Sequence, residues 1–283
     1  MTSGRKPARI QVREYGGGSQ VVVLLHGGPG AGGYLAPLAR ELAGRFRVLE
    51  PLQRSSGAEP LTVALHVADL YELVQGACGQ TPPALVGHSW GAMLGLAFAA
   101  AHPDSVRSLV LIACGTFDAA ARAELQATVE KRLDDDLRRR LERLPEECPD
   151  PDDRLRLFGD LLLPLYSCDP LARELDVAVC DARGHTETWQ DLLRLQVAGV
   201  YPAAFASIGA PVLMLHGALD PHPGRLVRAS LQPHLPQLEY LEWARCGHYP
   251  WLERGVREEF LDVLRRRLAE HFARTGLARD RLG

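Results

Sequence analysis

Short apolar runs alternate along the chain with longer stretches in which apolar residues recur at helical spacing. The short runs are rich in β-branched residues and predict strands buried on both faces, whereas the longer stretches predict helices. An alternating run at 9–15 predicts an antiparallel edge strand. The expected buried strands are 21–25, 47–52, 84–87, 106–113, 211–217 and 238–243. The expected helices around them are 34–43, 63–78, 92–102 and 251–272. This alternation predicts an α/β fold with a mostly parallel, doubly wound sheet.

The alternation stops near Gly115. From 118 to 206 the chain shows no strand pattern, and its apolar residues recur at helical spacing. The expected helical segments are 119–144, 152–166, 169–180 and 186–198. We therefore predict a core domain formed by 1–117 and 207–283, with a helical cap inserted at 118–206.

Composition narrows the function classes. The chain has 283 residues, 46% of them hydrophobic, and a formal net charge of −3. A nucleic-acid-binding protein usually shows a basic face, so we expect no nucleic-acid partner. No apolar run has membrane-spanning length, so we expect no membrane partner. The first 20 residues lack the apolar segment of a signal peptide, and the six cysteines lack metal-ligand spacing, so we expect reduced thiols and a cytoplasmic location.

The sequence Gly87-His88-Ser89-Trp90-Gly91 joins a predicted strand to a predicted helix. A serine on such a sharp turn is exposed at the carboxyl end of the sheet, and the flanking glycines leave room for the turn. The start of the helix also directs backbone N–H groups toward the space beside the serine. We therefore predict that Ser89 is a catalytic nucleophile.

A serine nucleophile needs a base, and the base needs a carboxylate that orients it. Asp220 follows the strand at 211–217, and His248 follows the strand at 238–243. The order Ser89, Asp220, His248 is the order of an α/β-hydrolase triad. We expect the backbone N–H groups of Trp90 and Gly28 to hold the oxyanion, with Gly27 as the neighbouring candidate. Three other histidines at strand ends are expected to hold loops together: His26, His88 and His216.

The loop after the strand at 21–25 also fits a dinucleotide-binding pattern. Gly28, Gly30 and Gly33 match G-x-G-x-x-G, and Glu50 lies at the end of a strand where a ribose-binding acid would lie. This alternative predicts an oxidoreductase. It leaves Ser89 unexplained, and Pro29 removes an N–H group that a pyrophosphate would use.

With these motifs the chain resembles the α/β-hydrolase fold, and within it the proline iminopeptidase family. The resemblance rests on four motifs spread over nearly the whole chain: His26-Gly27-Gly28-Pro29-Gly30, Gly87-His88-Ser89-Trp90-Gly91, Gly217-x-x-Asp220 and Gly247-His248. It implies a serine hydrolase, without metal or cofactor, that acts on small-molecule esters or amides or on short peptides. Removal of an N-terminal residue from peptides is one activity that it allows.

The sequence departs from the iminopeptidase pattern at two places. The family's Asp-Gln-Arg-Gly turn is here Leu52-Gln53-Arg54-Ser55, and the Trp-Glu pair of the family's cap is here Trp189-Gln190. Glu187 is the neighbouring acid, so Glu187 and Trp189 are the candidate substrate-binding residues. The same scaffold also leaves open a cofactor-free lyase or perhydrolase, or a ligand-binding protein.

Overall fold

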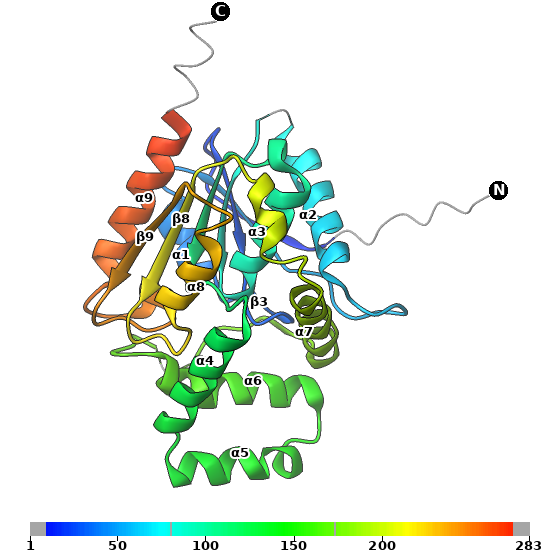
Figure 1. The fold of residues 1–283 in the computed structure, drawn as a ribbon, viewed down its shortest axis with the longest axis vertical. Coiled ribbons are helices and arrows are strands. Elements are labelled where there is room, and N and C mark those ends of the chain that lie inside the picture. The colour runs from blue at the N-terminus through cyan, green and yellow to red at the C-terminus, as the bar shows by residue number, and fades with distance from the viewer. Residues whose placement is uncertain (1–9, 80, 173, 274–283) are drawn as a thin grey trace, which may run out of the picture.

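The computed structural model describes residues 10–79, 81–172 and 174–273. A seven-stranded sheet runs through it in the order β1-β4-β2-β5-β6-β8-β9, and β1 is antiparallel to β4 while the other pairs are parallel (Figure 1). The strands are β1 (Val12–Tyr15), β2 (Val21–Leu25), β4 (Arg47–Pro51), β5 (Ala84–His88), β6 (Ser108–Ile112), β8 (Val212–Gly217) and β9 (Leu238–Trp243). The predicted α/β class and its mostly parallel sheet are confirmed.

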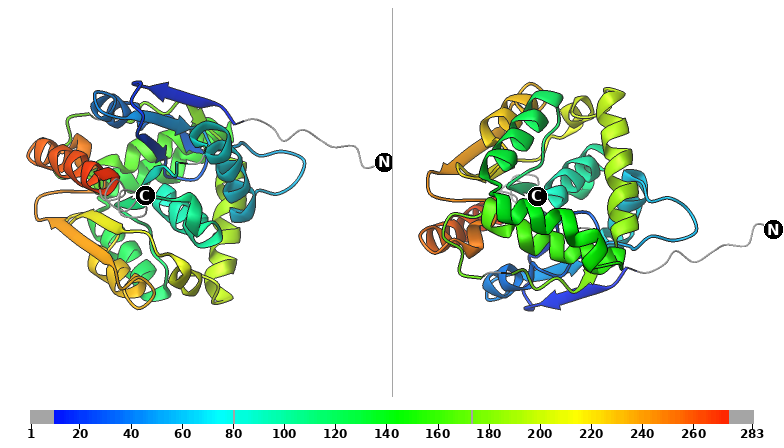
Figure 2. Two further views of the ribbon diagram at one scale, coloured as in Figure 1. Left: turned by 90° about the horizontal axis from the view of Figure 1, so that it is seen from above. Right: turned by 90° about the horizontal axis from the view of Figure 1, so that it is seen from below.

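Helices cover both faces of the sheet (Figure 2). These helices are α1 (Ala36–Leu42), α2 (Val63–Cys78), α3 (Trp90–Ala101), α8 (Gly224–Leu231) and α9 (Arg257–Ala273). Successive residues of one strand divide between the two faces: Val23 packs in the cluster with α2, α3 and α8, whereas Leu24 packs with α1 and α9. Both faces are therefore hydrophobic, which is why the strands appear in the sequence as continuous apolar runs.

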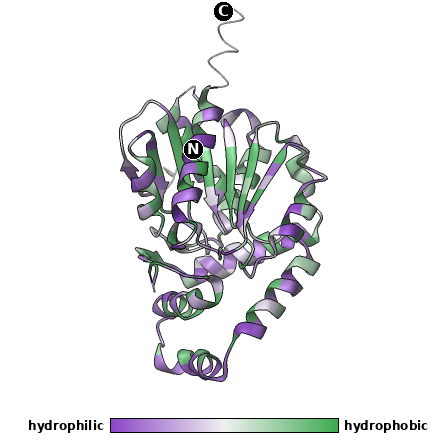
Figure 3. Cartoon of the chain, turned by 90° about the vertical axis from the view of Figure 1, so that its left-hand side faces the viewer, coloured by the Kyte–Doolittle hydropathy of each residue, from purple (hydrophilic) through white to green (hydrophobic). Residues whose placement is uncertain are grey.

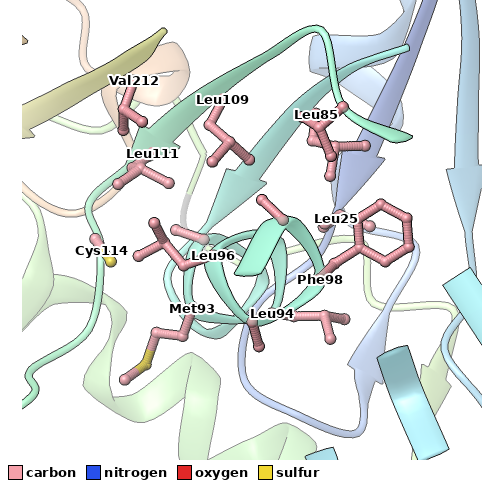
Figure 4. Close-up of a cluster of buried hydrophobic side chains, with 14 of the residues drawn as sticks. Leu25, Leu85, Met93, Leu94, Leu96, Phe98, Leu109, Leu111, Cys114 and Val212 are labelled. Atoms are coloured by element: carbon pink, nitrogen blue, oxygen red, sulfur yellow. The ribbon is translucent and has the colours of Figure 1, made fainter. Parts of the chain in front are cut away.

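Helix α3 packs directly on the sheet beneath Leu25, Leu85 and Leu109 (Figure 4). Its first turn approaches β2 so closely that a Cβ on Gly91 would lie 2.0 Å from the carbonyl oxygen of Leu25. This close contact fixes the start of α3, and with it the residue that precedes the helix.

The helices of the 118–206 region lie beyond the carboxyl end of the sheet, in the lower part of Figure 1. They are α4 (Ala119–Arg132), α5 (Asp135–Glu147), α6 (Pro151–Leu162) and α7 (Ala182–Val197). Figure 3 shows that they carry many hydrophilic residues, in contrast to the strands. The segment expected as one helix at 119–144 is two helices, because Asp134 accepts a hydrogen bond from the Leu137 amide and begins α5 there.

The prediction that 169–180 is helical, in a region without strands, is wrong. Its end forms β7 (Val179–Cys180), which pairs antiparallel with β3 (Ala31–Gly32) in the loop after β2. The β-branched residues Val177 and Val179 favour an extended chain. A Cβ on Gly30 would lie 2.4 Å from the Asp181 carbonyl oxygen, so glycine allows the two segments to meet.

Some boundaries also differ from the prediction. The last helix begins at Arg257 and not near residue 251, because Pro250–Leu252 form a 3-10 turn. Other 3-10 turns are Pro103–Ser105, Leu163–Tyr166 and Ala203–Ser207. Helix α8 was not predicted. Across the ranges that the structure describes, no helix has both the length and the apolar character needed to cross a bilayer.

Candidate active site

Ser89 occupies a strained turn between β5 and α3. Its φ of 55° and ψ of −117° are unfavourable for a residue with a side chain, and its amide donates to the Ile112 carbonyl at 2.9 Å. A Cβ on Gly87 would lie 2.2 Å from the Gly91 carbonyl oxygen, so the turn requires glycine there. This is the sharp strand-to-helix turn that the sequence predicted, and it leaves Ser89 partly exposed.

Asp220 and His248 form a buried hydrogen-bonded pair. Asp220 follows β8, His248 follows β9, and the distance from Nδ1 of His248 to Oδ2 of Asp220 is 2.7 Å. Burial lowers the pKa of His248 below its ordinary value of 6.5, and the Asp220 carboxylate opposes this shift in part. Burial alone would raise the pKa of Asp220, but the imidazoles of His248 and His222 hold it well below its usual range. The pair thus combines an ionised carboxylate with a neutral imidazole at neutral pH.

Ser89 and His248 line the same cavity, whose volume is about 190 Å³. Within the part of the chain that the structure describes, no hydrogen bond joins the Ser89 hydroxyl to the His248 imidazole. Such contacts in an unliganded site often tighten only when substrate binds. The structure thus brings Ser89, Asp220 and His248 together at one edge of the sheet.

The predicted oxyanion donors have different surroundings. Gly28 lines the cavity with a φ of 72°, and Trp90 is the first residue of α3. Neither amide donates to another described residue, and Gly28, though not Trp90, is among the residues that line the cavity. Gly27 is not available, because its amide donates to the Tyr34 hydroxyl at 2.6 Å. This corrects the proposal of Gly27 as an oxyanion donor.

A buried polar chain joins the loops around Ser89. The Tyr34 hydroxyl lies 2.6 Å from Nδ1 of His88, and Nε2 of His88 lies 2.9 Å from the His248 carbonyl oxygen. Burial lowers the pKa of His88 well below its ordinary value. Because Tyr34 accepts from Gly27, its own proton is donated to His88, whose Nε2–H then donates to His248. The expectation that His88 holds loops together is confirmed, whereas Tyr34 was missed.

Gln53, in the turn after β4, has a structural role. Its Oε1 accepts the Trp90 indole N–H at 2.7 Å, and its Nε2 donates to the His26 carbonyl at 3.0 Å. Nε2 of His26 in turn accepts the Gln53 amide at 3.2 Å. Gln53 therefore fixes the indole of the first α3 residue to the loop after β2.

The structure does not bring Glu187 and Trp189 to the cavity. Glu187 on α7 accepts the Leu61 amide at 2.8 Å and pairs with Arg183 at 2.7 Å, and both contacts lower the pKa of its carboxyl. Trp189 packs against the hydrophobic cluster of α2 and α3. Both side chains are thus committed to joining α7 to the rest of the fold.

The cavity is mostly apolar and lies between the carboxyl edge of the sheet and α6. Two ionisable residues of α6, Arg156 and Asp160, also line it. Its apolar walls come mainly from α6, the 3-10 turn that follows it and the segment before β7: Leu155, Phe158, Leu162, Leu163, Leu175 and Val177. No local motif marks these residues, because α6 approaches Ser89 only in the folded chain.

Two observations contradict the dinucleotide-binding alternative. Glu50 is buried, and its carboxylate accepts the Tyr15 hydroxyl at 2.9 Å, so it is not placed to bind a ribose. Ala31 and Gly32, within the glycine pattern, form β3, and α1 begins only at Ala36, whereas in a pyrophosphate site the glycine pattern opens directly onto the N-terminus of a helix.

Asp220, His222 and His248 bring three metal-ligand atoms within 4.8 Å of one another. These atoms already satisfy one another, since both imidazole Nδ1 atoms lie within hydrogen-bonding distance of the carboxylate. The arrangement is one suited to proton transfer.

Comparison with known proteins gives the family. The alpha/beta hydrolase family matches residues 22–261. The chain is 30% identical over 264 residues to the pimeloyl-[acyl-carrier protein] methyl ester esterase of Chromobacterium violaceum, covering 88% of this chain and 93% of that protein. It is 39% identical over 99 residues to the proline iminopeptidase of Neisseria gonorrhoeae, covering 32% and 31% of the two chains. A thermophilic esterase from Thermogutta terrifontis has the same fold, with a TM-score of 0.66, 22% identity and coverage of 95% and 97%. The chain therefore belongs to the alpha/beta hydrolase family.

Proposed function

We propose that the protein is a serine hydrolase that cleaves small esters through Ser89, His248 and Asp220. The observation that carries the proposal is the buried 2.7 Å contact between His248 and Asp220 at the cavity that Ser89 lines. Family membership supports hydrolysis. The chain also matches 93% of the length of a methyl ester esterase, which favours an ester substrate.

The geometry suggests the order of events. His248 removes the Ser89 proton as the hydroxyl attacks the carbonyl carbon, and Asp220 stabilises the imidazolium that results. The Gly28 and Trp90 amides hold the oxyanion, and one such donor is typically worth roughly 10²- to 10³-fold in rate. His248 then protonates the leaving alcohol, and water attacks the acyl-enzyme with His248 as base.

The volume of the cavity limits the size of the acyl group. A dry cavity of roughly 150 Å³ accommodates benzene, so about 190 Å³ accommodates a short aliphatic or single-ring acyl group. Residues 118–206 are proposed as the cap, since α6 of this region supplies much of the apolar wall. An apolar wall favours an uncharged acyl chain, because burying an unpaired charge is costly.

An aminopeptidase is the second candidate, and Asp160 is the observation that favours it. Its carboxylate is the acidic group among the residues that line the cavity, where it could accept a substrate ammonium group. Burial raises the pKa of Asp160, which weakens that role. Prolyl and alanyl anilides distinguish the two functions. An aminopeptidase cleaves them and spares their N-acetylated forms, whereas an esterase prefers short acyl esters and ignores the free amine.

The direct test is labelling with a fluorophosphonate followed by intact-mass analysis. We expect one adduct on the native protein and none on Ser89→Ala, while Ser55→Ala, which removes an exposed hydroxyl, labels normally. Ser89→Ala should also abolish turnover of short-chain esters. Full labelling or full turnover in Ser89→Ala would refute the mechanism. A folded protein that neither labels nor hydrolyses esters would point to a ligand-binding protein, whereas one that labels at Ser89 without hydrolysing esters would point to a lyase or perhydrolase.

A further inference from the structure

Two imidazoles share the Asp220 carboxylate. Oδ2 lies 2.7 Å from Nδ1 of His248, and Oδ1 lies 3.1 Å from Nδ1 of His222. The His222 amide also donates to Oδ1 at 2.9 Å. Any residue at 222 supplies that amide, whereas the side-chain contact requires a donor at the position of Nδ1.

The ring of His222 is held against that of His248. The two rings stack, with centroids 4.7 Å apart and planes 18° from parallel. His216, which is buried, has Nε2 2.9 Å from the His222 carbonyl oxygen and 3.4 Å from Oδ2 of Asp220. The ring of Tyr166 lies 5.9 Å from that of His222. Pro221 and Pro223 flank His222 and restrict the backbone on either side.

We propose that His222 is a positioning residue for the hydrolase site: a second donor that fixes the Asp220 carboxylate and shares its negative charge with His248. The proposal rests on the function assigned to Ser89, His248 and Asp220. His222 does not line the cavity, so its effect reaches substrate only through Asp220 and His248.

The first consequence concerns orientation. The amide of residue 222 holds Oδ1 with one hydrogen bond, and the imidazole of His222 adds a second. The second bond further restrains rotation of the carboxylate about its Cβ–Cγ bond and keeps Oδ2 directed at His248. The imidazole is then fixed in the tautomer that leaves Nε2 free to accept the Ser89 proton. Loss of the His222 donor should therefore lower kcat and change KM little, because substrate is bound elsewhere.

The second consequence concerns charge. Burial lowers the pKa of His248, Asp220 raises it, and the imidazoles of His222 and His216 lower it further. His88, Tyr166 and Tyr249 also pack against His248 and supply no full charge when His88 is neutral. Without the His222 donor, more of the carboxylate charge falls on His248. The pKa of His248 should then rise, and the acid limb of the pH profile of kcat/KM should move to higher pH.

Two variants separate the donor from the ring. His222→Phe keeps a ring that can stack on His248 but has no donor, whereas His222→Asn keeps an N–H near the position of Nδ1. We expect kcat of His222→Phe to fall about 10- to 100-fold with its acid limb shifted upward. His222→Asn should recover most of that loss with its acid limb near that of the native enzyme. Equal kcat and acid limbs in the two variants would overturn the proposal.

A measurement without substrate separates this proposal from the assignment of Ser89. Proton NMR of the native protein should show two downfield imidazole N–H resonances, one from each ring on Asp220. One should disappear in His222→Phe, and the His248 resonance should remain. A single resonance in the native protein would refute the second donor even if Ser89 labels as expected. Two resonances in a protein that does not label would instead reject the hydrolase assignment.

Discussion

The hydroxyl of Tyr34 lies 2.6 Å from Nδ1 of His88 and connects the loop after β2 to the turn that carries Ser89. The same hydroxyl accepts the amide of Gly27, next to the proposed oxyanion donor Gly28. One side chain thus holds the nucleophile turn and the oxyanion loop in a fixed relation.

Tyr34→Phe tests this relation. The substitution leaves the Gly27 amide and Nδ1 of His88 buried without partners, and each such group costs about 1–3 kcal/mol. We expect a lower free energy of unfolding in urea and a kcat/KM at least about 10-fold lower, because the Gly28 amide loses its support. Tyr71→Phe is the matched control, since Tyr71 is 37% exposed. Unchanged stability and kcat/KM in Tyr34→Phe would contradict the role of this hydroxyl.

Buried histidines should make the protein less stable in acid. Burial lowers the pKa of His26 and of His66 from 6.5 to about 4. In this interval the unfolded chain binds protons that the folded chain does not, so stability falls as the pH falls from 6.5 toward 4. The free energy of unfolding falls by about 1.4 kcal/mol for each unit of pH and each such imidazole, so each accounts for a loss of about 3 kcal/mol by pH 4.

His66→Asn measures one of these contributions. The imidazole of His66 contacts the Thr188 hydroxyl at 2.9 Å, and asparagine keeps a polar partner for it. The slope of unfolding free energy against pH should fall by up to about 1.4 kcal/mol for each unit of pH. His234→Asn, at a partly exposed position, is the control. An unaltered slope in His66→Asn would contradict a lowered pKa, because it would show that this imidazole binds its proton equally in the folded and unfolded protein.

Local patterns in the sequence predicted the sheet well. Continuous apolar runs gave β2, β5, β6 and β8 because both faces of each strand are covered. The segment before β7 could not be predicted in the same way. Its apolar residues fit helical spacing, and the contact that makes it extended comes from Gly32, far away in the chain.

The candidate site shows the same limit. The positions of Ser89, Asp220 and His248 follow from short motifs at strand ends, and the structure places them together; their roles stay predictions. Tyr34 and His222 carry no motif, because their importance depends on partners that are close only in the folded chain. The cavity wall on α6 was missed for the same reason.

Glu253 provides a last test, of the turn that holds His248. Its buried carboxylate accepts the amides of Gly247 at 2.9 Å, Cys168 at 2.8 Å and Asp169 at 2.7 Å. It therefore joins the turn before His248 to the segment after Tyr166. The Tyr166 carbonyl itself accepts the His248 amide at 2.7 Å.

Glu253→Gln keeps the shape of the side chain but turns an N–H group toward one of these amides. A hydrogen bond to a charged group is worth about 1.5–3 kcal/mol, so we expect the free energy of unfolding to fall by about 2–4 kcal/mol. The ester hydrolysis rate should fall as well, because the turn before His248 loses part of its support. Glu72→Gln, at an exposed position of α2, controls for the loss of one charge. If Glu253→Gln matched this control in both urea unfolding and kcat, the carboxylate would have no part in holding His248.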